Sequence, residues 1–91
     1  MTITTDPTKY IYFTPPPDEV PFAFSKAKQM LSNIDPTATR NVLVSLAMTG
    51  RALPDGSKLK LRVCKTHSGN GTTREEYRRF VTDLAAAWEN A

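Results

Sequence analysis

Aromatic and basic side chains are concentrated in two short segments whose residue types could bind single-stranded nucleic acid. Tyrosines alternate with other residues in segment 9–13, so Tyr10 and Tyr12 would face away from the core and Ile11 and Phe13 would lie on the opposite face. In segment 57–65 the apolar residues Leu59, Leu61 and Val63 would be buried, and a wet, basic face would carry Lys58, Lys60, Arg62 and Cys64. The residues concerned are Tyr10, Tyr12, Lys58, Lys60, Arg62 and Lys65. Aromatic rings stack on bases and cations neutralise phosphates, so one sheet face carrying both would bind a single strand. The alternative interpretation is that the lysines keep an exposed edge strand soluble.

A second candidate surface is an apolar strip on a helix predicted over residues 36–49. Besides its main apolar face, this helix carries Val44 and Met48 on the far side. A helix that is apolar on two sides is either central to a core or half buried at an interface. Val44 and Met48 are therefore predicted to form a protein interface, with Phe22 and Phe24 as candidate additions. The alternative is that the N-terminal segment or the last helix covers this side.

The residues that could support catalysis or metal binding are few. Cys64 and His67 lie close to the start of the last predicted helix, where a thiolate would be stabilised. A nucleophile also needs an oriented base and an oxyanion site, and a structural zinc site needs four ligands. The chain has one cysteine and one histidine, so we expect no enzyme, no metal and no cofactor.

Two further nucleic-acid or phosphate motifs are incomplete. The glycine-containing segment 68–72 precedes a helix, as phosphate-binding loops do, but it lacks the lysine of the Walker pattern. The first two predicted helices could form a helix-turn-helix, although a strand replaces the third helix of that motif. Its groove-facing residues would be Thr37, Thr39, Arg40 and Asn41. We regard segment 68–72 as a mobile connection to a capped helix, and the apolar second half of the second helix suits a buried position better than a DNA groove.

Periodicity and turn residues predict the elements that would position these residues. Strands are expected over 9–13 and 57–65, and helices over 25–33, over 36–49 and from Thr72 or Thr73 to the C-terminus. Segment 14–21 reads as a proline-rich connector and segment 66–71 as a flexible loop. Ser25 and Asp35 are the expected caps of the first two helices, and Gly50 ends the second. The predicted fold is α+β, of order β-α-α-β-α, with three helices packed on one face of a short two-stranded sheet.

The last predicted helix has the clearest apolar stripe. The stripe consists of Tyr77, Phe80, Val81, Leu84 and Trp88. We expect it to supply much of the core together with Leu43 and Leu46, so that Trp88→Ala lowers thermal stability markedly. On its outer side, Arg79 is expected to form ion pairs with Glu75 and Asp83.

Length and charge limit the remaining choices. The 91 residues suit one domain, 1–91, with residues 1–8 frayed, and the net charge of +3 comes from the second half of the chain. No secretory signal and no membrane-spanning apolar run are visible, so a cytoplasmic protein that does not enter a membrane is expected. We predict a small non-catalytic binding or regulatory protein, a modulator or inhibitor that docks on a partner macromolecule. A protein partner is expected, single-stranded nucleic acid is the alternative, and a homodimer is a further candidate.

Overall fold

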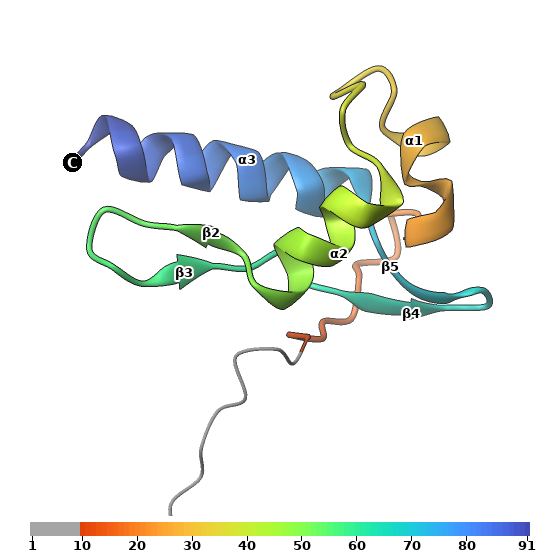
Figure 1. Cartoon of the computed structure of the whole chain (residues 1–91). Coiled ribbons are helices and arrows are strands. Elements are labelled where there is room, and N and C mark those ends of the chain that lie inside the picture. Colours follow the sequence, from red (N-terminus) through yellow and green to blue (C-terminus); the bar gives the residue numbers. More distant parts are fainter. Residues whose placement is uncertain (1–9) are drawn as a thin grey trace, which may run out of the picture.

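The computed structural model describes residues 10–91, which form a small α+β domain (Figure 1). Its elements are β1 (Phe22–Ala23), the 3₁₀ helix η1 (Phe24–Lys26), α1 (Ala27–Met30), α2 (Arg40–Met48), β2 (Arg51–Ala52), β3 (Lys58–Leu59), β4 (Cys64–Thr66), β5 (Gly69–Thr72) and α3 (Arg74–Glu89). The predicted α+β class is confirmed. The predicted single two-stranded sheet is wrong, because the strands form two antiparallel sheets, β1-β5-β4 and β2-β3. The predicted fraying of residues 1–8 lies outside the described residues.

The strand predicted over 9–13 is reduced to a single bridge. Tyr12 and Val63 form an isolated parallel β-bridge. The Phe13 N–H donates to the Val63 carbonyl at 2.8 Å, and the Val63 N–H donates to the Ile11 carbonyl at 2.8 Å. The next donor that the N-terminal segment would supply to such a parallel ladder is residue 15, which is a proline without an N–H. The pairing therefore ends where the prolines begin.

The strand predicted over 57–65 is divided between the two sheets. Its middle turns aside because Leu61 N–H donates to the Leu46 carbonyl, at the end of α2, at 3.0 Å. Leu61 and Val63 point inward as predicted, and both are fully buried. Cys64, which the alternation placed on the wet face, is buried instead. The loop predicted over 66–71 is wrong, since its second half belongs to β5.

The first two helices are shorter than predicted. Ser25 caps neither η1 nor α1, and α2 begins at Arg40, where the Thr39 hydroxyl accepts from Val42 N–H at 3.4 Å. Gly50 follows α2 with a φ of 76°, as expected of a residue that ends a helix.

Asp35 does not cap a helix but closes a local turn. Its carboxylate accepts from the backbone N–H of Thr37 at 2.9 Å and from the Thr37 hydroxyl at 2.6 Å, which is an Asx turn. The Tyr77 hydroxyl also donates to this carboxylate at 2.6 Å. The hydrogen bonds from Thr37, and then that from Tyr77, lower the pKa of Asp35. Burial raises the pKa of Tyr77, and the hydrogen bond to Asp35 raises it further. The turn thus ties the approach to α2 to the first turn of α3.

The core lies between α2, η1, α1, the first sheet and the N-terminal half of α3. Its largest members are Phe22, Phe24, Leu31, Leu43, Leu46, Leu61, Val63, Tyr77 and Phe80. The stripe predicted on α3 is buried only over its first half, since Val81 is 44% exposed and Trp88 is 55% exposed. The second half of α3 lies over the β2–β3 hairpin instead of the core (Figure 1), and Trp88 Nε1–H donates to the Ala52 carbonyl at 3.1 Å. Within residues 10–91, no helix is long and apolar enough to span a bilayer.

Candidate docking groove

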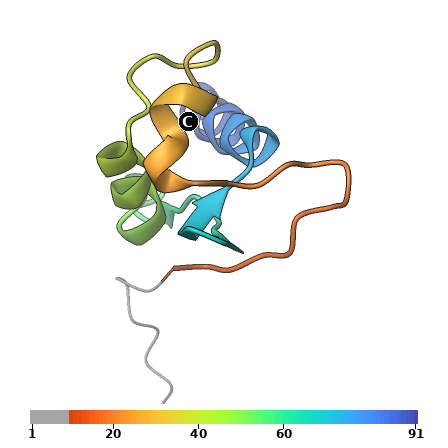
Figure 2. The same ribbon diagram turned by 90° about the vertical axis from the view of Figure 1, so that its right-hand side faces the viewer.

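Residues 14–21, the proline segment, arch away from the first sheet before the chain returns as β1 (Figure 2). Two hollows open between this segment and β4. The first, of about 410 Å³, is lined by Tyr12, Phe13, Thr14, Pro15, Cys64 and Lys65. The second, of about 450 Å³, is lined by Pro21, Lys65, Thr66 and His67. Because both hollows reach Lys65, we treat them as one groove.

Small residues face each other across the β4–β5 hairpin beside the groove. Cys64 lies opposite Gly71 and Thr66 opposite Gly69. Aromatic rings and prolines line the hollows as well.

Tyr12 and Lys65 form the polar rim of this groove. The Lys65 ammonium lies 5.1 Å from the centroid of the Tyr12 ring, a cation–π contact. The Tyr12 hydroxyl donates to Asn70 Oδ1 at 3.3 Å, and the ring is 49% exposed. Tyr10 meets Tyr12 edge-on at 6.2 Å between centroids and packs on Phe24 from its other side.

The predicted faces of segment 9–13 are wrong. Both tyrosines were expected to point outward, with Ile11 and Phe13 inward. Tyr10 instead packs against the core, and Ile11 is 48% exposed. A single bridge does not impose the strict alternation of a strand, so these side chains follow their local packing.

Of the six predicted nucleic-acid-binding residues, the structure gathers Tyr10, Tyr12 and Lys65. Lys58 lies in β3, in the other sheet, and Lys60 follows it beside Gly50. Arg62 is engaged elsewhere: its guanidinium binds the Glu76 carboxylate at 2.9 Å and stacks over the Phe13 ring at 4.9 Å. The single aromatic and basic face is therefore not formed.

The predicted protein interface is only half accessible. Val44 and Met48 are half buried, and Val44 packs against the core near Tyr10. Phe22 and Phe24, the candidate additions, are core residues, so they cannot extend an exposed strip. Tyr10 of the N-terminal segment and Phe24 of η1 line the same small hollow as Val44, so this side of α2 lies partly against them.

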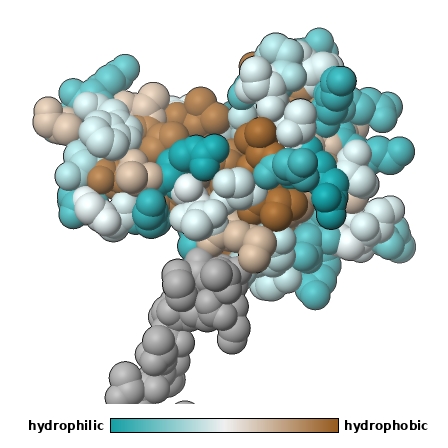
Figure 3. All heavy atoms as spheres, viewed as in Figure 1, coloured by the Kyte–Doolittle hydropathy of each residue, from teal (hydrophilic) through white to brown (hydrophobic). Residues whose placement is uncertain are grey.

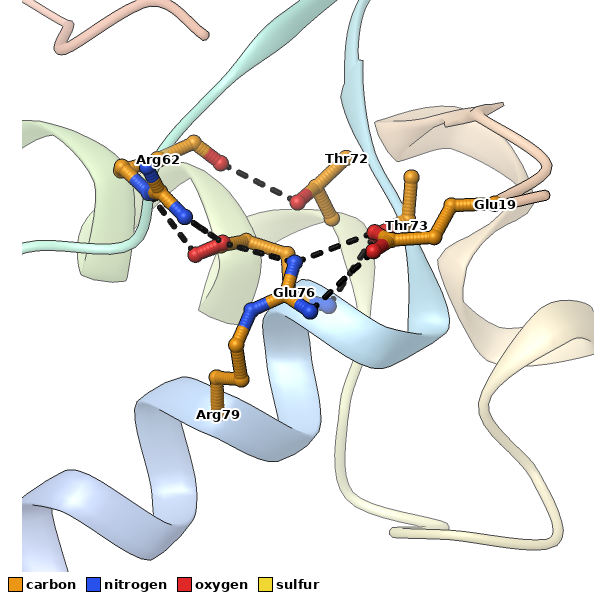
Figure 4. A network of polar contacts seen from close by, with 6 residues as sticks. All are labelled: Glu19, Arg62, Thr72, Thr73, Glu76 and Arg79. Atoms are coloured by element: carbon orange, nitrogen blue, oxygen red, sulfur yellow. Dashed lines mark hydrogen bonds and ion pairs between the residues drawn. The ribbon is translucent and has the colours of Figure 1, made fainter. Parts of the chain in front are cut away.

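A polar network that sequence reasoning missed holds the proline segment against α3 (Figure 4). The Glu19 carboxylate accepts from Arg79 at 3.0 and 3.1 Å and from the Thr73 hydroxyl at 2.8 Å. Thr73 is the N-cap of α3, as predicted, and its hydroxyl accepts from Glu76 N–H at 3.0 Å. The same segment that forms the groove wall is thereby attached to the first turns of α3.

The network continues from α3 to the chain that leads into β4. Glu76 accepts from Arg62 through both carboxylate oxygens and also from Arg79 at 3.4 Å, and the Thr72 hydroxyl donates to the Arg62 carbonyl at 3.0 Å. Arg79 therefore pairs with Glu19 and Glu76, and its predicted pairs with Glu75 and Asp83 are wrong. Both buried carboxylates are fully paired, as buried charges must be.

We predict that neutralising Glu19 loosens the groove wall. Arg79 and then Thr73 hold the pKa of the Glu19 carboxyl below its ordinary value of 4.5. Its contribution to stability is therefore complete above about pH 4.5 and is lost as the pH falls through the lower folded value. Glu19→Gln should increase the fast backbone motion of Val20 at pH 7, measured by ¹⁵N relaxation, and acidification should do the same to the parent chain.

Asp18 offers the matched control for this prediction. It is an exposed carboxylate in the same segment, and Asp18→Asn should leave Val20 unchanged. Equal mobility in both variants would mean that the ion pair does not hold the segment.

The remaining candidate sites are used structurally. Burial raises the pKa of the Cys64 thiol, which keeps it protonated, and His67 lies exposed in the hairpin turn. Segment 68–72 forms the turn and strand of the β4–β5 hairpin instead of an anion-binding loop. Helices α1 and α2 are separated by nine residues, 31–39, which is too long for a helix-turn-helix.

No protein-family model, curated protein or solved structure matches this chain. Its class is thus set by its own geometry: a small α+β domain with an open, aromatic-walled groove beside a sheet edge.

Proposed function

We propose that this chain is a small non-catalytic binding protein that docks on a partner protein through the groove. The observation that carries the proposal is the pair of hollows, both lined by Lys65, beside aromatic rings and prolines. Binding sites are concave and mostly apolar, with few polar groups that fix orientation, and the groove has this composition. Acting in this way, the protein would be a modulator or inhibitor that occupies a surface of its partner.

The partner segment is expected to be extended. The backbone N–H and C=O of Val63 form hydrogen bonds with Ile11 and Phe13. Along a strand, the backbone N–H and C=O groups of successive residues point to alternate sides. Those of Lys65 therefore point to the same side, away from β5, where Pro15 has no N–H to donate to the Lys65 carbonyl. An extended peptide could add to this edge by main-chain hydrogen bonds, with its side chains in the hollows.

The charge at the groove favours an acidic residue in the partner segment. Lys65 is the one lysine or arginine among the described residues that line the two hollows, and it stands where they meet. A carboxylate placed there would meet the ammonium without displacing another ion pair.

Single-stranded nucleic acid is the second candidate, favoured by the exposed Tyr12 ring beside Lys65. Strand binding requires several cations that follow the phosphates as well as aromatic rings. Lys58 belongs to the other sheet, Lys60 follows it, and Arg62 is paired with Glu76, so this groove supplies fewer phosphate contacts than the binding of a nucleic-acid strand requires.

The test is selection of peptides from a random display library against the full chain, followed by fluorescence anisotropy with the selected peptides and with labelled oligothymidylate. We expect peptides that contain an acidic residue flanked by apolar ones. Lys65→Glu and Tyr12→Ala should each weaken their binding by about tenfold.

Lys58→Glu is the control, because it makes the same charge change on the other sheet. Equal affinity of the Lys58→Glu and Lys65→Glu variants would place the binding surface elsewhere and refute the proposal. Binding of oligothymidylate alone, weakened by salt and lost in Tyr12→Ala, would replace it with the nucleic-acid function.

A further inference from the structure

The outer side of α3 carries an exposed stripe that no described element covers. The stripe consists of Arg78, Thr82, Ala85 and Glu89. Their spacings of four, three and four residues place them along one line of the helix, as in the seam of a coiled coil. Val81 and Trp88, both exposed, flank this line on one side. In the view of Figure 3, apolar atoms reach the surface over α3.

The order of side chains along the stripe is self-complementary. A cation, Arg78, stands at one end and an anion, Glu89, at the other, with two small residues between them. Neither charged side chain forms an ion pair within the part of the chain that the structure describes. A surface of this kind pairs with itself when the second copy runs in the opposite direction.

We propose that a second copy of this chain docks on the stripe, with the two α3 helices antiparallel about a two-fold axis between residues 83 and 84. In this arrangement Arg78 lies opposite the partner's Glu89, and Thr82 lies opposite the partner's Ala85. Each ion pair occurs twice, and the small central residues allow the helices to approach closely.

The apolar flank fits the same axis. Along the helix axis, Val81 lies two residues from the position opposite the partner's Trp88. At the rise of an α-helix this offset is about 3 Å. Trp88 is already oriented by its hydrogen bond to the Ala52 carbonyl, so little side-chain freedom is lost when the ring is covered. The ring that the monomer leaves half exposed would thus be buried against Val81 of the other copy.

The expected dimer is weak and depends on concentration. Stable interfaces bury about 800 Å² per partner, and a pair of four-turn helices contributes less than this. We therefore expect dissociation in the micromolar range. This dimer is independent of the groove, whose residues lie on β4 and the proline segment.

The experiment is sedimentation velocity of the full chain over a range of concentrations, combined with tryptophan fluorescence. Trp88 is the one tryptophan of the sequence, so its emission should shift to shorter wavelength as the dimer forms. Arg78→Glu and Glu89→Arg should each weaken self-association by about tenfold or more, because like charges then meet twice.

Mixing the two variants keeps the test decisive even if one of them is less stable. One chain then supplies two carboxylates and the other two guanidinium groups, so a heterodimer should form that neither variant gives alone. Lys65→Glu, a charge change at the groove, should dimerise like the parent chain. A parent chain that stays monomeric at millimolar concentration, or an Arg78→Glu variant that dimerises normally, would overturn the proposal.

Discussion

Phe80→Ala should lower the free energy of unfolding by about 3–5 kcal/mol, whereas Trp88→Ala should lower it by about 1–2 kcal/mol. Phe80 is 5% exposed and belongs to the core, so its removal leaves a cavity. Trp88 is the larger side chain, but more than half of it is in contact with solvent and its burial comes from the β2–β3 hairpin. Urea unfolding of both variants, in dilute solution where any dimer is dissociated, measures the difference.

This contrast reverses the expectation drawn from sequence, in which Trp88 was a core residue. A domain of this size has a total stability of about 5–10 kcal/mol, so Phe80→Ala removes a large part of it. Equal losses in the two variants would show that the C-terminal half of α3 is packed as tightly as the N-terminal half.

Gly71→Ala, which exchanges a single hydrogen for a methyl group, should lower the free energy of unfolding by about 2–4 kcal/mol. Gly71 is the central residue of the first sheet and pairs with Ala23 on one side and Cys64 on the other. A methyl group there would overlap the Phe22 carbonyl of β1, which is backbone and cannot move aside without opening the sheet.

Gly69→Ala is the matched control in the same strand. A methyl group at Gly69 meets nothing within contact distance, but its φ of 106° is unfavourable for alanine, so we expect a smaller loss of about 1–2 kcal/mol. Thermal unfolding of both variants, followed by circular dichroism, shows whether steric overlap at residue 71 or the backbone conformation at residue 69 costs more stability. A greater loss of stability for Gly69→Ala than for Gly71→Ala would mean that β1 moves aside for the methyl group at residue 71.

Local signals predicted the features of the fold that depend on a few neighbouring residues. Thr73 caps α3, Gly50 follows α2, and Leu61 and Val63 alternate inward as expected. The other predictions were wrong where the same residues could adopt two local structures of similar energy. Asp35 before a proline can cap a helix or close an Asx turn, and the hydroxyl of Tyr77, 42 residues away, joins the second arrangement.

Of the candidate groove, sequence reasoning singled out only the residues that form its rim. The alternation of aromatic and basic residues singled out Tyr12 and Lys65, which do lie together. The groove wall depends on Glu19, whose partners Thr73 and Arg79 are 54 and 60 residues away. No local pattern marks such a partner, because Glu19 beside three prolines reads equally well as a solvated charge. The split of segment 57–65 was hidden for the same reason, since it depends on a carbonyl of α2.

The attachment of Glu19 to Arg79 also determines when the groove can exist during synthesis. The proline segment leaves the ribosome before α3, but the guanidinium that secures it belongs to α3. Contacts between such distant residues form late, after the local elements are in place. A nascent or truncated chain that ends before α3 would therefore carry Tyr12 and the prolines without a finished binding surface. Under the proposed function, docking would therefore require that α3 has been synthesised and has folded.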